Sequence, residues 1–438
     1  MWFKFFVIFC FAISLQIVKS DNANSKVICY YDGSSFLKEG LGKVTVEDIE
    51  PALSFCTHLV YGYAGLKAEN NKLVSLNEQL DLDTGKGYFR AVNTLKRKFP
   101  NLKVILSVGG DHDNENREKY LTILESSVGR TSFINSAYTI LKSYTFDGLN
   151  LAWEFPKAKP KKIRSSIGSF FHKIKKTFTG DSVMDDKAEE HREEFTAFVR
   201  EIKNALRHDG FELSLTVLPH TNASVYYDVP AIINNLDYVI VGEWDIQTPD
   251  RNPKEADLSA PIYQLSERQE GANVQTEVSY WLSQKAPASK LVIGIPAYGR
   301  AWKLTSDSGI TGVPPLPADG PAPEGPQTKI AGLLSWPEIC AKLPNPGNTN
   351  LKGEDAPLRK VNDPTKRFGP YAFRIPDDNG EHGIWVSYDD PDSAGNKGAY
   401  VKSKNLGGIA ILDLSMDDFR GTCSGDKFPI LRAAKYQL

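Results

Sequence analysis

The sequence has few cysteines, few methionines and almost no net charge. It contains five Cys and three Met among 438 residues, and its 52 Lys and Arg nearly balance 54 Asp and Glu. A formal charge of −2 gives no reason to expect nucleic acid as a partner. The seven histidines show no paired metal-ligand spacing such as HExxH, and no glycine-rich nucleotide loop follows an apolar run. The sequence therefore predicts no metal and no cofactor.

No apolar run is long enough to cross a bilayer, although the N-terminus is strongly apolar. Residues 1–20, MWFKFFVIFCFAISLQIVKS, carry one lysine, an apolar run from Phe5 to Val18, and small residues where a signal peptidase cuts. The run falls short of the ~20 residues that a spanning helix needs. We expect a signal peptide over 1–20 and a secreted protein; the alternative is a membrane anchor.

Four cysteines remain once Cys10 is removed with the signal peptide. They are Cys29, Cys56, Cys340 and Cys423. An even number of cysteines in an oxidising compartment predicts two disulfides, for which three pairings are open.

Eight short runs rich in β-branched and aromatic residues alternate with helical or polar stretches. They begin at Lys26, Thr57, Lys103, Phe146, Phe211, Leu236, Lys290 and Gly407. Amphipathic helices are expected between them, for example from Tyr88 and from Ala188. The runs are almost continuously apolar, as strands covered on both faces should be. This order predicts an α/β fold, a (β/α)8 TIM barrel, and the competing architecture is a doubly wound open sheet.

Two stretches interrupt the alternation, each after a strand. Residues 157–190 follow the fourth strand with a basic block, Lys157 to Lys176, and an acidic run from Asp185. Residues 301–385 follow the seventh strand and are rich in Pro and Gly. We therefore expect strands one to seven over 21–300, an insertion over 301–385, and strand eight with a C-terminal helix over 386–438. Both insertions leave the ends of strands where a barrel carries its function.

Five ordered motifs resemble glycoside hydrolase family 18, the chitinases. They are SVGG (107–110), FDGLNLAWEFP (146–156), IPAYGRAW (295–302), WVSYDDPDS (385–393) and GGIAILDLSMDDF (407–419). The resemblance covers nearly the whole mature chain. It implies that the second insertion is a small α+β domain and that Cys29 pairs with Cys56 and Cys340 with Cys423.

The detailed pattern resembles a chitinase-like branch of that family, the insect imaginal disc growth factors. NLAWEFPK, TVLPHTNASVYYDVPAI and RGTCSGDKFPILRAAKYQL carry this likeness. The branch implies a secreted growth factor that promotes proliferation, polarisation and motility of imaginal disc cells, in cooperation with insulin-like signalling. The implied partner is a cell-surface receptor or an insulin-like peptide.

The fourth strand has lost groups that chitinases use. Alternation places Asn150, Ala152 and Glu154 on the face that looks into the barrel. In family 18 the substrate's own acetamido group is the nucleophile, one of the exceptions to the two-carboxylate scheme. The resemblance makes Glu154 the general acid and implies aspartates where Asn150 and Ala152 stand, the second of which would align the acetamide. The sequence therefore predicts loss of chitinase activity.

Other positions also differ from those of chitinases in ways that predict loss of activity. Residues that line part of the sugar-binding groove are kept. By resemblance Trp244 replaces a tyrosine that holds the acetamide, Leu412 replaces a tryptophan floor, and Asp111 stands where an aromatic platform is common. The residues kept for contact with a chitooligosaccharide are Tyr30, Asp147, Asp245, Tyr298 and Arg300, with Trp244 beside them.

Each feature also has a structural interpretation. Glu154 can be a hydrogen-bonded remnant, and Asp147 a turn residue. The basic block can be a solvated loop, or it can present Phe170, Phe171, Ile174 and Phe178 to a receptor or an anionic glycan. Asn222 begins an Asn-Ala-Ser glycosylation sequon. The function hypotheses are an inactive chitinase-like growth factor, a slow chitinase that uses Glu154, and a chitooligosaccharide-binding lectin.

Overall fold

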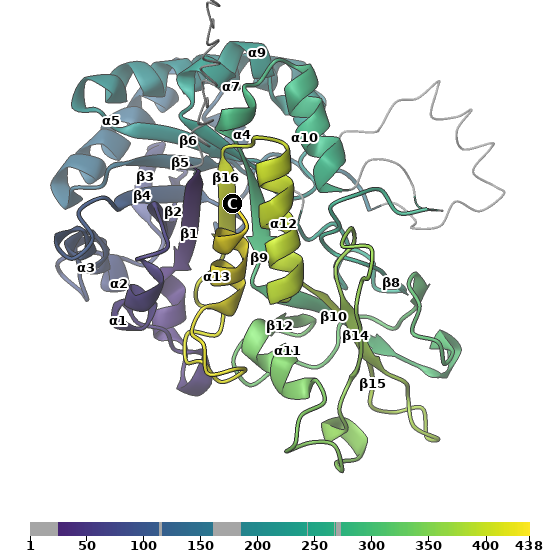
Figure 1. The fold of residues 1–438 in the computed structure, drawn as a ribbon. Helices are drawn as coiled ribbons and strands as arrows, with labels where there is room; N and C mark the ends of the chain where they lie inside the picture. Colours follow the sequence, from purple (N-terminus) through teal and green to yellow (C-terminus); the bar gives the residue numbers. More distant parts are fainter. Residues whose placement is uncertain (1–24, 114–115, 161–184, 243, 267, 269–272) are drawn as a thin grey trace, which may run out of the picture.

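The fold is built around a closed barrel of eight parallel strands (Figure 1). The computed structural model describes residues 25–113, 116–160, 185–242, 244–266, 268 and 273–438. The barrel strands are β1 (Lys26–Asp32), β2 (His58–Lys67), β4 (Lys103–Gly109), β5 (Gly148–Ala152), β6 (Glu212–Thr216), β7 (Tyr238–Val241), β9 (Leu291–Pro296) and β16 (Gly408–Leu412). Strand β1 pairs in parallel with both β2 and β16, which closes the sheet. The predicted TIM barrel is confirmed.

Helices surround the barrel. The longer ones are α5 (Ser127–Tyr144), α7 (Ala188–Leu206), α10 (Val274–Ser283) and α12 (Pro391–Ser403). The shorter ones are α1 (Val46–Ile49), α2 (Glu78–Asp81), α3 (Tyr88–Thr94), α4 (Lys119–Thr122), α8 (Ala223–Tyr226), α9 (Val229–Ile232) and α13 (Pro429–Tyr436). Helix α7 confirms the amphipathic helix expected from Ala188, because Phe195, Phe198 and Ile202 are buried at three- and four-residue spacing.

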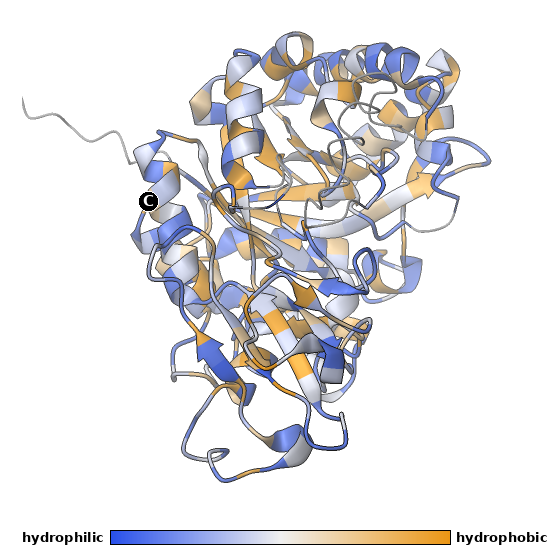
Figure 2. Cartoon of the chain, turned by 90° about the vertical axis from the view of Figure 1, so that its right-hand side faces the viewer, coloured by the Kyte–Doolittle hydropathy of each residue, from blue (hydrophilic) through white to orange (hydrophobic). Residues whose placement is uncertain are grey.

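Strand side chains alternate between two apolar cores. One core lies between the strands and the helices and includes Leu149, Leu151 and Trp153. The other fills the barrel interior and includes Tyr30 and Trp244. Figure 2 shows the apolar strands gathered at the centre of the molecule, with hydrophilic residues on the outer helices. The barrel is therefore a packed core rather than a pore.

Between β9 and β16 the chain forms a second, antiparallel sheet beside the barrel (Figure 1). Its strands, in spatial order, are β12 (Leu333–Ser335), β10 (Tyr298–Leu304), β15 (Gly383–Tyr388), β14 (Tyr371–Arg374) and β13 (Arg359–Val361). Helix α11 (Trp336–Lys342) follows β12, and two short strands, β8 (Glu255–Ala256) and β11 (Leu316–Pro317), pair with each other. The expected limits of the insertion, 301 and 385, fall inside β10 and β15. A further strand, β3 (Lys72–Ser75), pairs antiparallel with β2.

Two disulfides fix the ends of the chain to the body. Cys29 in β1 pairs with Cys56, and Cys340 in α11 pairs with Cys423, with Cα–Cα distances of 6.0 and 5.9 Å. This is the pairing that the family resemblance implied. Closing a loop of 83 residues, as the second disulfide does, restricts the unfolded chain strongly.

Some expectations fall on residues beyond the described part of the chain. The signal peptide over 1–20 and most of the basic block, 161–176, lie outside the described residues. Within the part that is described, no helix has the length and apolar character needed to span a bilayer.

Candidate functional site

The end of β5 carries the residues expected at the barrel mouth, by which we mean the end of the barrel where the carboxyl ends of its strands lie. Asn150 and Ala152 are 0% and 1% exposed and lie on the opposite face of β5 from Leu149 and Leu151, which pack against the helices. Glu154 follows two residues after the strand and is also buried. The structure thus brings Asn150, Ala152 and Glu154 together on the interior side, as the alternation of a strand requires.

Asn150 is held by a complete polar network inside the barrel. Register places it level with Ser107 of β4 and Ser214 of β6. Its Oδ1 accepts hydrogen bonds from Ser107 (2.9 Å), Thr216 (3.0 Å) and Tyr30 (3.3 Å), and its Nδ2 donates to Ser214 at 2.9 Å. The Asn150 amide makes these four hydrogen bonds without carrying a charge, whereas a buried carboxylate would need a cation.

Ala152 contributes its backbone carbonyl, but no polar side-chain atom, to the polar contacts of this site. Its backbone carbonyl accepts a hydrogen bond from Gly110 at 2.9 Å. A Cβ on Gly109 would lie only 2.3 Å from that same carbonyl oxygen, so a glycine is required there. A methyl group at position 152 can neither accept a hydrogen bond nor offset a positive charge on a substrate.

Glu154 is a buried carboxyl group that accepts a backbone hydrogen bond and forms a longer ion pair. Oε1 accepts a hydrogen bond from the backbone N–H of Asp111 at 3.1 Å. Oε2 lies 3.6 Å from Nε of Arg117 and accepts no hydrogen bond from the described residues. Burial and the Asp111 carboxylate raise the pKa of Glu154 to about 7, and Arg117 offsets part of the rise. Such a group can carry a proton near neutral pH.

A second carboxyl group at the mouth, Asp245, is fully paired. Arg300 donates from Nε to Oδ1 at 2.7 Å and from Nη2 to Oδ2 at 2.6 Å, and the Tyr298 hydroxyl donates to Oδ2 at 2.8 Å. Burial disfavours the charged form, but the guanidinium and the hydrogen bonds outweigh it, so the pKa of Asp245 lies below its ordinary value. Asp245, Tyr298 and Arg300 therefore form one preorganised cluster.

Trp244 and Leu412 pack against the same glycine inside the barrel. A Cβ on Gly294 would meet the Trp244 ring at 2.4 Å and the Leu412 side chain at 3.0 Å. Both side chains belong to the interior core, and Trp244 is 6% exposed. The large ring at 244 and the smaller side chain at 412 together fill this end of the barrel. Leu412 offers no flat aromatic floor for a sugar ring.

Asp147 requires a correction. It precedes β5, at the opposite end of the strand from Glu154, and does not belong to the mouth. Its Oδ2 accepts hydrogen bonds from Val104 N at 2.7 Å and from Lys96 Nζ at 2.9 Å. The expectation that Asp147 contacts a sugar is wrong, and its interpretation as a hydrogen-bonding turn residue fits these contacts.

Several mouth residues carried no signal in the sequence. The Tyr63 ring stacks on His112 with centroids 4.0 Å apart, and Tyr63 packs against the interior core. His220 donates from Nε2 to the Asp245 carbonyl at 2.8 Å, and burial, together with Arg251, lowers the pKa of His220 to about 4. Arg251 in turn donates to the Ala158 carbonyl at 2.5 Å. These residues come from β2 and from the loops after β4, β6 and β7, so only folding brings them together.

Tyr30 and Asn222 each make hydrogen bonds within the protein. Tyr30 is 2% exposed, and its hydroxyl lies 2.8 Å from Thr216 Oγ1, deep in the interior. Asn222 caps α8, because its Oδ1 accepts hydrogen bonds from the backbone N–H and the hydroxyl of Ser224. The second contact joins the two polar residues of the glycosylation sequon.

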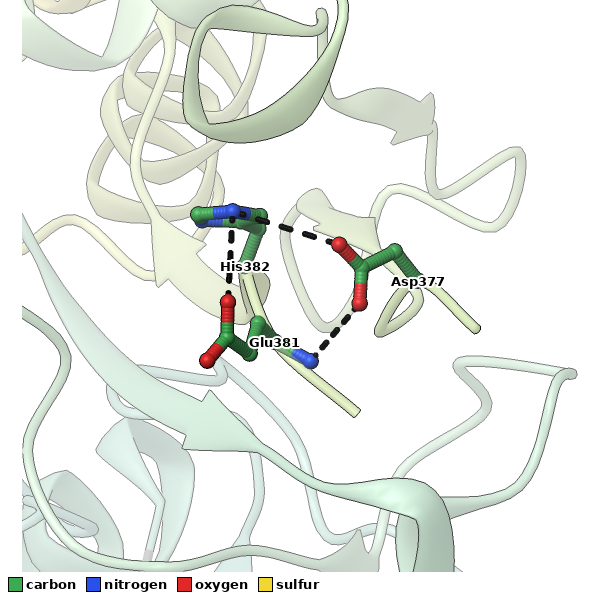
Figure 3. Close-up of side chains that lie close together, drawn as sticks. All are labelled: Asp377, Glu381 and His382. Carbon is green, nitrogen blue, oxygen red and sulfur yellow. Dashed lines mark hydrogen bonds and ion pairs between the residues drawn. The ribbon is translucent and has the colours of Figure 1, made fainter. Parts of the chain in front are cut away.

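One group of potential metal ligands occurs in the described part of the chain, away from the mouth (Figure 3). Asp377, Glu381 and His382 lie in the turn between β14 and β15, and Nε2 of His382 is 3.9 Å from each carboxylate. Asp377 Oδ1 accepts hydrogen bonds from the backbone N–H groups of Asn379 and Glu381. Stabilising this turn accounts for Asp377, and the exposed group does not define a metal centre.

Comparison with known proteins agrees with the geometry of the barrel and its mouth. The model of the glycosyl hydrolases family 18 matches residues 26–417, so the chain belongs to that family. "Bacteria-responsive protein 1" of Aedes aegypti is 62% identical over 100% of both chains. "Chitinase-like protein Idgf4" of Drosophila melanogaster is 60% identical over 99% of this chain and 100% of the relative. Within the family, the close relatives are thus imaginal disc growth factors and other chitinase-like proteins.

Solved structures show the same fold in a chitinase and in a pseudo-chitinase. The Ostrinia furnacalis Group II chitinase catalytic domain 2 has a TM-score of 0.78 at 29% identity, covering 94% of this chain and 96% of that one. Human YKL-39, described as a pseudo-chitinase with retained chitooligosaccharide binding properties, has a TM-score of 0.74 at 26% identity, covering 94% and 99%. The barrel alone therefore does not distinguish the two activities.

Proposed function

We propose that this protein is a secreted, catalytically inactive chitinase-like growth factor. It promotes proliferation, polarisation and motility of imaginal disc cells, in cooperation with insulin-like signalling. The observation that carries the proposal is Ala152, a methyl group where family 18 chemistry needs an aligning carboxylate. The names of the close relatives support the growth-factor role. The two disulfides suit an oxidising extracellular environment.

The magnitudes favour loss of catalysis. A positioned general acid contributes ~10² to 10⁴ in rate. Alignment of an intramolecular nucleophile corresponds to effective molarities of ~10⁵ to 10⁸ M. Glu154 retains the smaller contribution, while Ala152 removes the larger one.

The test of inactivity uses a fluorogenic chitooligosaccharide with the wild-type protein and the Glu154→Gln variant. We expect no turnover from either protein. Turnover by the wild type that the substitution abolishes would establish the alternative, a slow chitinase, and overturn the proposal.

The test of growth promotion uses pure protein added to cultured imaginal disc cells. We expect cell number to rise with dose, and Glu154→Gln to be equally potent, because the effect comes from binding and not from hydrolysis. The partner is a cell-surface receptor or an insulin-like peptide. No response of the cells to pure protein would defeat this role.

The basic block is our candidate contact surface for that partner or for an anionic glycan. The test deletes residues 161–176 and not the whole block from Lys157, because Lys157 and Ala158 form hydrogen bonds with Asp111 and Arg251 at the mouth. We expect reduced potency with an unchanged melting temperature. Unchanged potency would assign the contact to another surface.

The retained cluster of Asp245, Tyr298 and Arg300 favours a second function, the binding of a chitooligosaccharide. Preorganised polar groups beside aromatic rings are what sugar recognition uses. The binding retained by a pseudo-chitinase with the same fold supports this function. Calorimetry with chitohexaose should give heat for the wild type and less heat for Tyr298→Ala. No heat at millimolar sugar would rule out this function.

A further inference from the structure

A charged cluster covers Glu154 at the mouth. The Glu154 side chain is 2% exposed, whereas Arg117, whose Nε lies 3.6 Å from Oε2, is 49% exposed. The half-exposed Arg117 side chain is therefore in ion-pair contact with a carboxyl group that is itself buried. Arg117 thus acts as a cap over Glu154.

Asp111 positions this cap. Its backbone N–H donates to Glu154 Oε1, and its Oδ1 lies 3.8 Å from Nη2 of Arg117. Its Oδ2 accepts a hydrogen bond from Lys157 Nζ at 2.5 Å. Asp111 has a positive φ of 64°, so the chain turns sharply after β4 and brings the side chain over the end of β5. The cluster holds two acids and two bases, so each charge has a partner.

Lys157 is itself held in place across the mouth. Its neighbour Ala158 donates its N–H to the His220 carbonyl at 2.9 Å and accepts a hydrogen bond from Arg251 at 2.5 Å. The segment after β5 is therefore tied to the loops after β6 and β7. These contacts keep the lysine next to Asp111 and the cap in place.

We infer that Arg117, positioned by Asp111 and Lys157, separates Glu154 from any ligand at the mouth and is a second block on catalysis. A general acid must approach the leaving oxygen to within ~2.6–3.2 Å. A sugar ring cannot bring its oxygen so close to a carboxyl group that a guanidinium covers. The inference rests on the proposed function in one respect, because it adds to the inactivity that Ala152 explains.

Carboxyl labelling tests the cap without any assay of activity. The full-length protein is treated with a carbodiimide and glycine ethyl ester, and labelled peptides are quantified by mass spectrometry. We expect labelling of Glu154 to rise severalfold in Arg117→Ala and by a smaller factor in Lys157→Ala. Lys254→Ala, which breaks an exposed ion pair with Asp319, is the matched control and should leave Glu154 unchanged. Exposed Glu69 serves as the internal reference.

Equal labelling of Glu154 in the wild type and both cap variants would overturn the inference. The Lys157→Ala arm keeps the test decisive if Arg117→Ala does not fold. Turnover by the wild type that Glu154→Gln abolishes would defeat both the proposed function and the block by Arg117, whereas equal labelling without turnover would overturn the block alone, so the two failures are distinguishable.

Activity measurements then sharpen the result. The double variant, Asn150→Asp with Ala152→Asp, introduces the two aspartates and keeps Arg117. The triple variant adds Arg117→Ala, which removes the guanidinium from Glu154. We expect the triple variant to hydrolyse a fluorogenic chitooligosaccharide ~10² to 10⁴ times faster than the double variant, which is the contribution of a general acid that can reach its substrate. A double variant that is as active as the triple variant would show that Arg117 blocks nothing.

Discussion

Asp245 and Glu154 both follow a barrel strand at its carboxyl end, yet their surroundings differ. Asp245 receives two hydrogen bonds from Arg300 and one from Tyr298, and its pKa is lowered. Glu154 receives one backbone hydrogen bond and a longer contact from Arg117, and its pKa is raised to about 7. Burial acts on both groups, so the difference lies in the hydrogen bonds and ion pairs that each carboxylate receives and in the Asp111 carboxylate, which raises the pKa of Glu154.

This comparison shows how the two sides of the mouth have diverged. The side of β7 and β10 keeps a complete charged cluster that is stable as an ion pair. The side of β5 keeps an acid whose neighbours on the strand no longer bear charge. The first side carries a carboxylate held in its charged form, whereas the second carries a buried carboxyl group that can hold a proton near neutral pH.

The largest expected effect comes from breaking the complete cluster. Asp245→Asn leaves the partly buried Arg300 without its carboxylate, and we expect the free energy of unfolding to fall by ~3–5 kcal/mol at pH 7. Urea unfolding followed by tryptophan fluorescence measures the loss. Adding Arg300→Gln should recover part of it, because the unpaired charge is then removed. A loss no greater than that of a surface pair would contradict the cluster's role.

Glu154→Gln should raise the free energy of unfolding, in contrast to Asp245→Asn, and the size of the increase should depend on pH. The pKa of Glu154 is raised to about 7 in the folded protein, above the ~4.3 of an unfolded chain. The folded state then binds the proton more tightly, so wild-type stability falls as pH rises from the unfolded pKa through 7. We expect Glu154→Gln to be more stable than wild type by up to about 3 kcal/mol above pH 7.

The control for that prediction is the same pair of proteins at low pH. Below the unfolded pKa, Glu154 is protonated in both states, so the difference between the variant and the wild type should vanish. Asp245→Asn should behave in reverse, because a lowered pKa contributes stability above the unfolded pKa that is lost as pH falls through the folded pKa. If the stability of both variants relative to wild type changed with pH in the same direction, the contrast between Glu154 and Asp245 would be contradicted.

Asn150→Asp tests the neutral network on the altered side. The carboxylate loses the N–H that donates to Ser214 and is buried without a cation, so we expect a loss of ~1–3 kcal/mol at pH 7. Thermal unfolding at low pH should recover stability, since a protonated carboxyl group can again donate. An unchanged melting temperature at neutral pH would mean that the interior tolerates the aspartate.

The smallest effect is expected from an exposed pair. Lys254 and Asp319 form an ion pair in which the side chains are 79% and 48% exposed. Lys254→Ala should cost less than ~1 kcal/mol, and added salt should reduce the difference further. Urea unfolding at low and high salt measures it. A loss of stability comparable to that of Asp245→Asn would show that burial does not explain the difference between the exposed pair and the Asp245 cluster.

Much of the fold could be predicted because it follows from local pattern. The apolar runs at Lys103 and Lys290 form buried parallel strands, and the periodicity after Ala188 forms α7. The exchange at Ala152 and the retention of Glu154 could be seen in one short stretch. Of the two interpretations of Asp147, its contacts with Val104 and Lys96 before β5 fit the hydrogen-bonding turn residue, which the sequence motif alone could not decide.

The amino-acid sequence by itself predicted the barrel strands, two disulfides and a methyl group on the inward face at position 152, while the cysteine pairing and the carboxylate expected at 152 came from the family resemblance. Alternation along a strand and the chemistry of a methyl group are local properties, so no neighbour was needed to infer them. Only the tertiary structure decided that Arg117 covers Glu154 and that Arg300 pairs with Asp245. Charge pairing and burial depend on residues from separate loops, which meet only when the barrel closes.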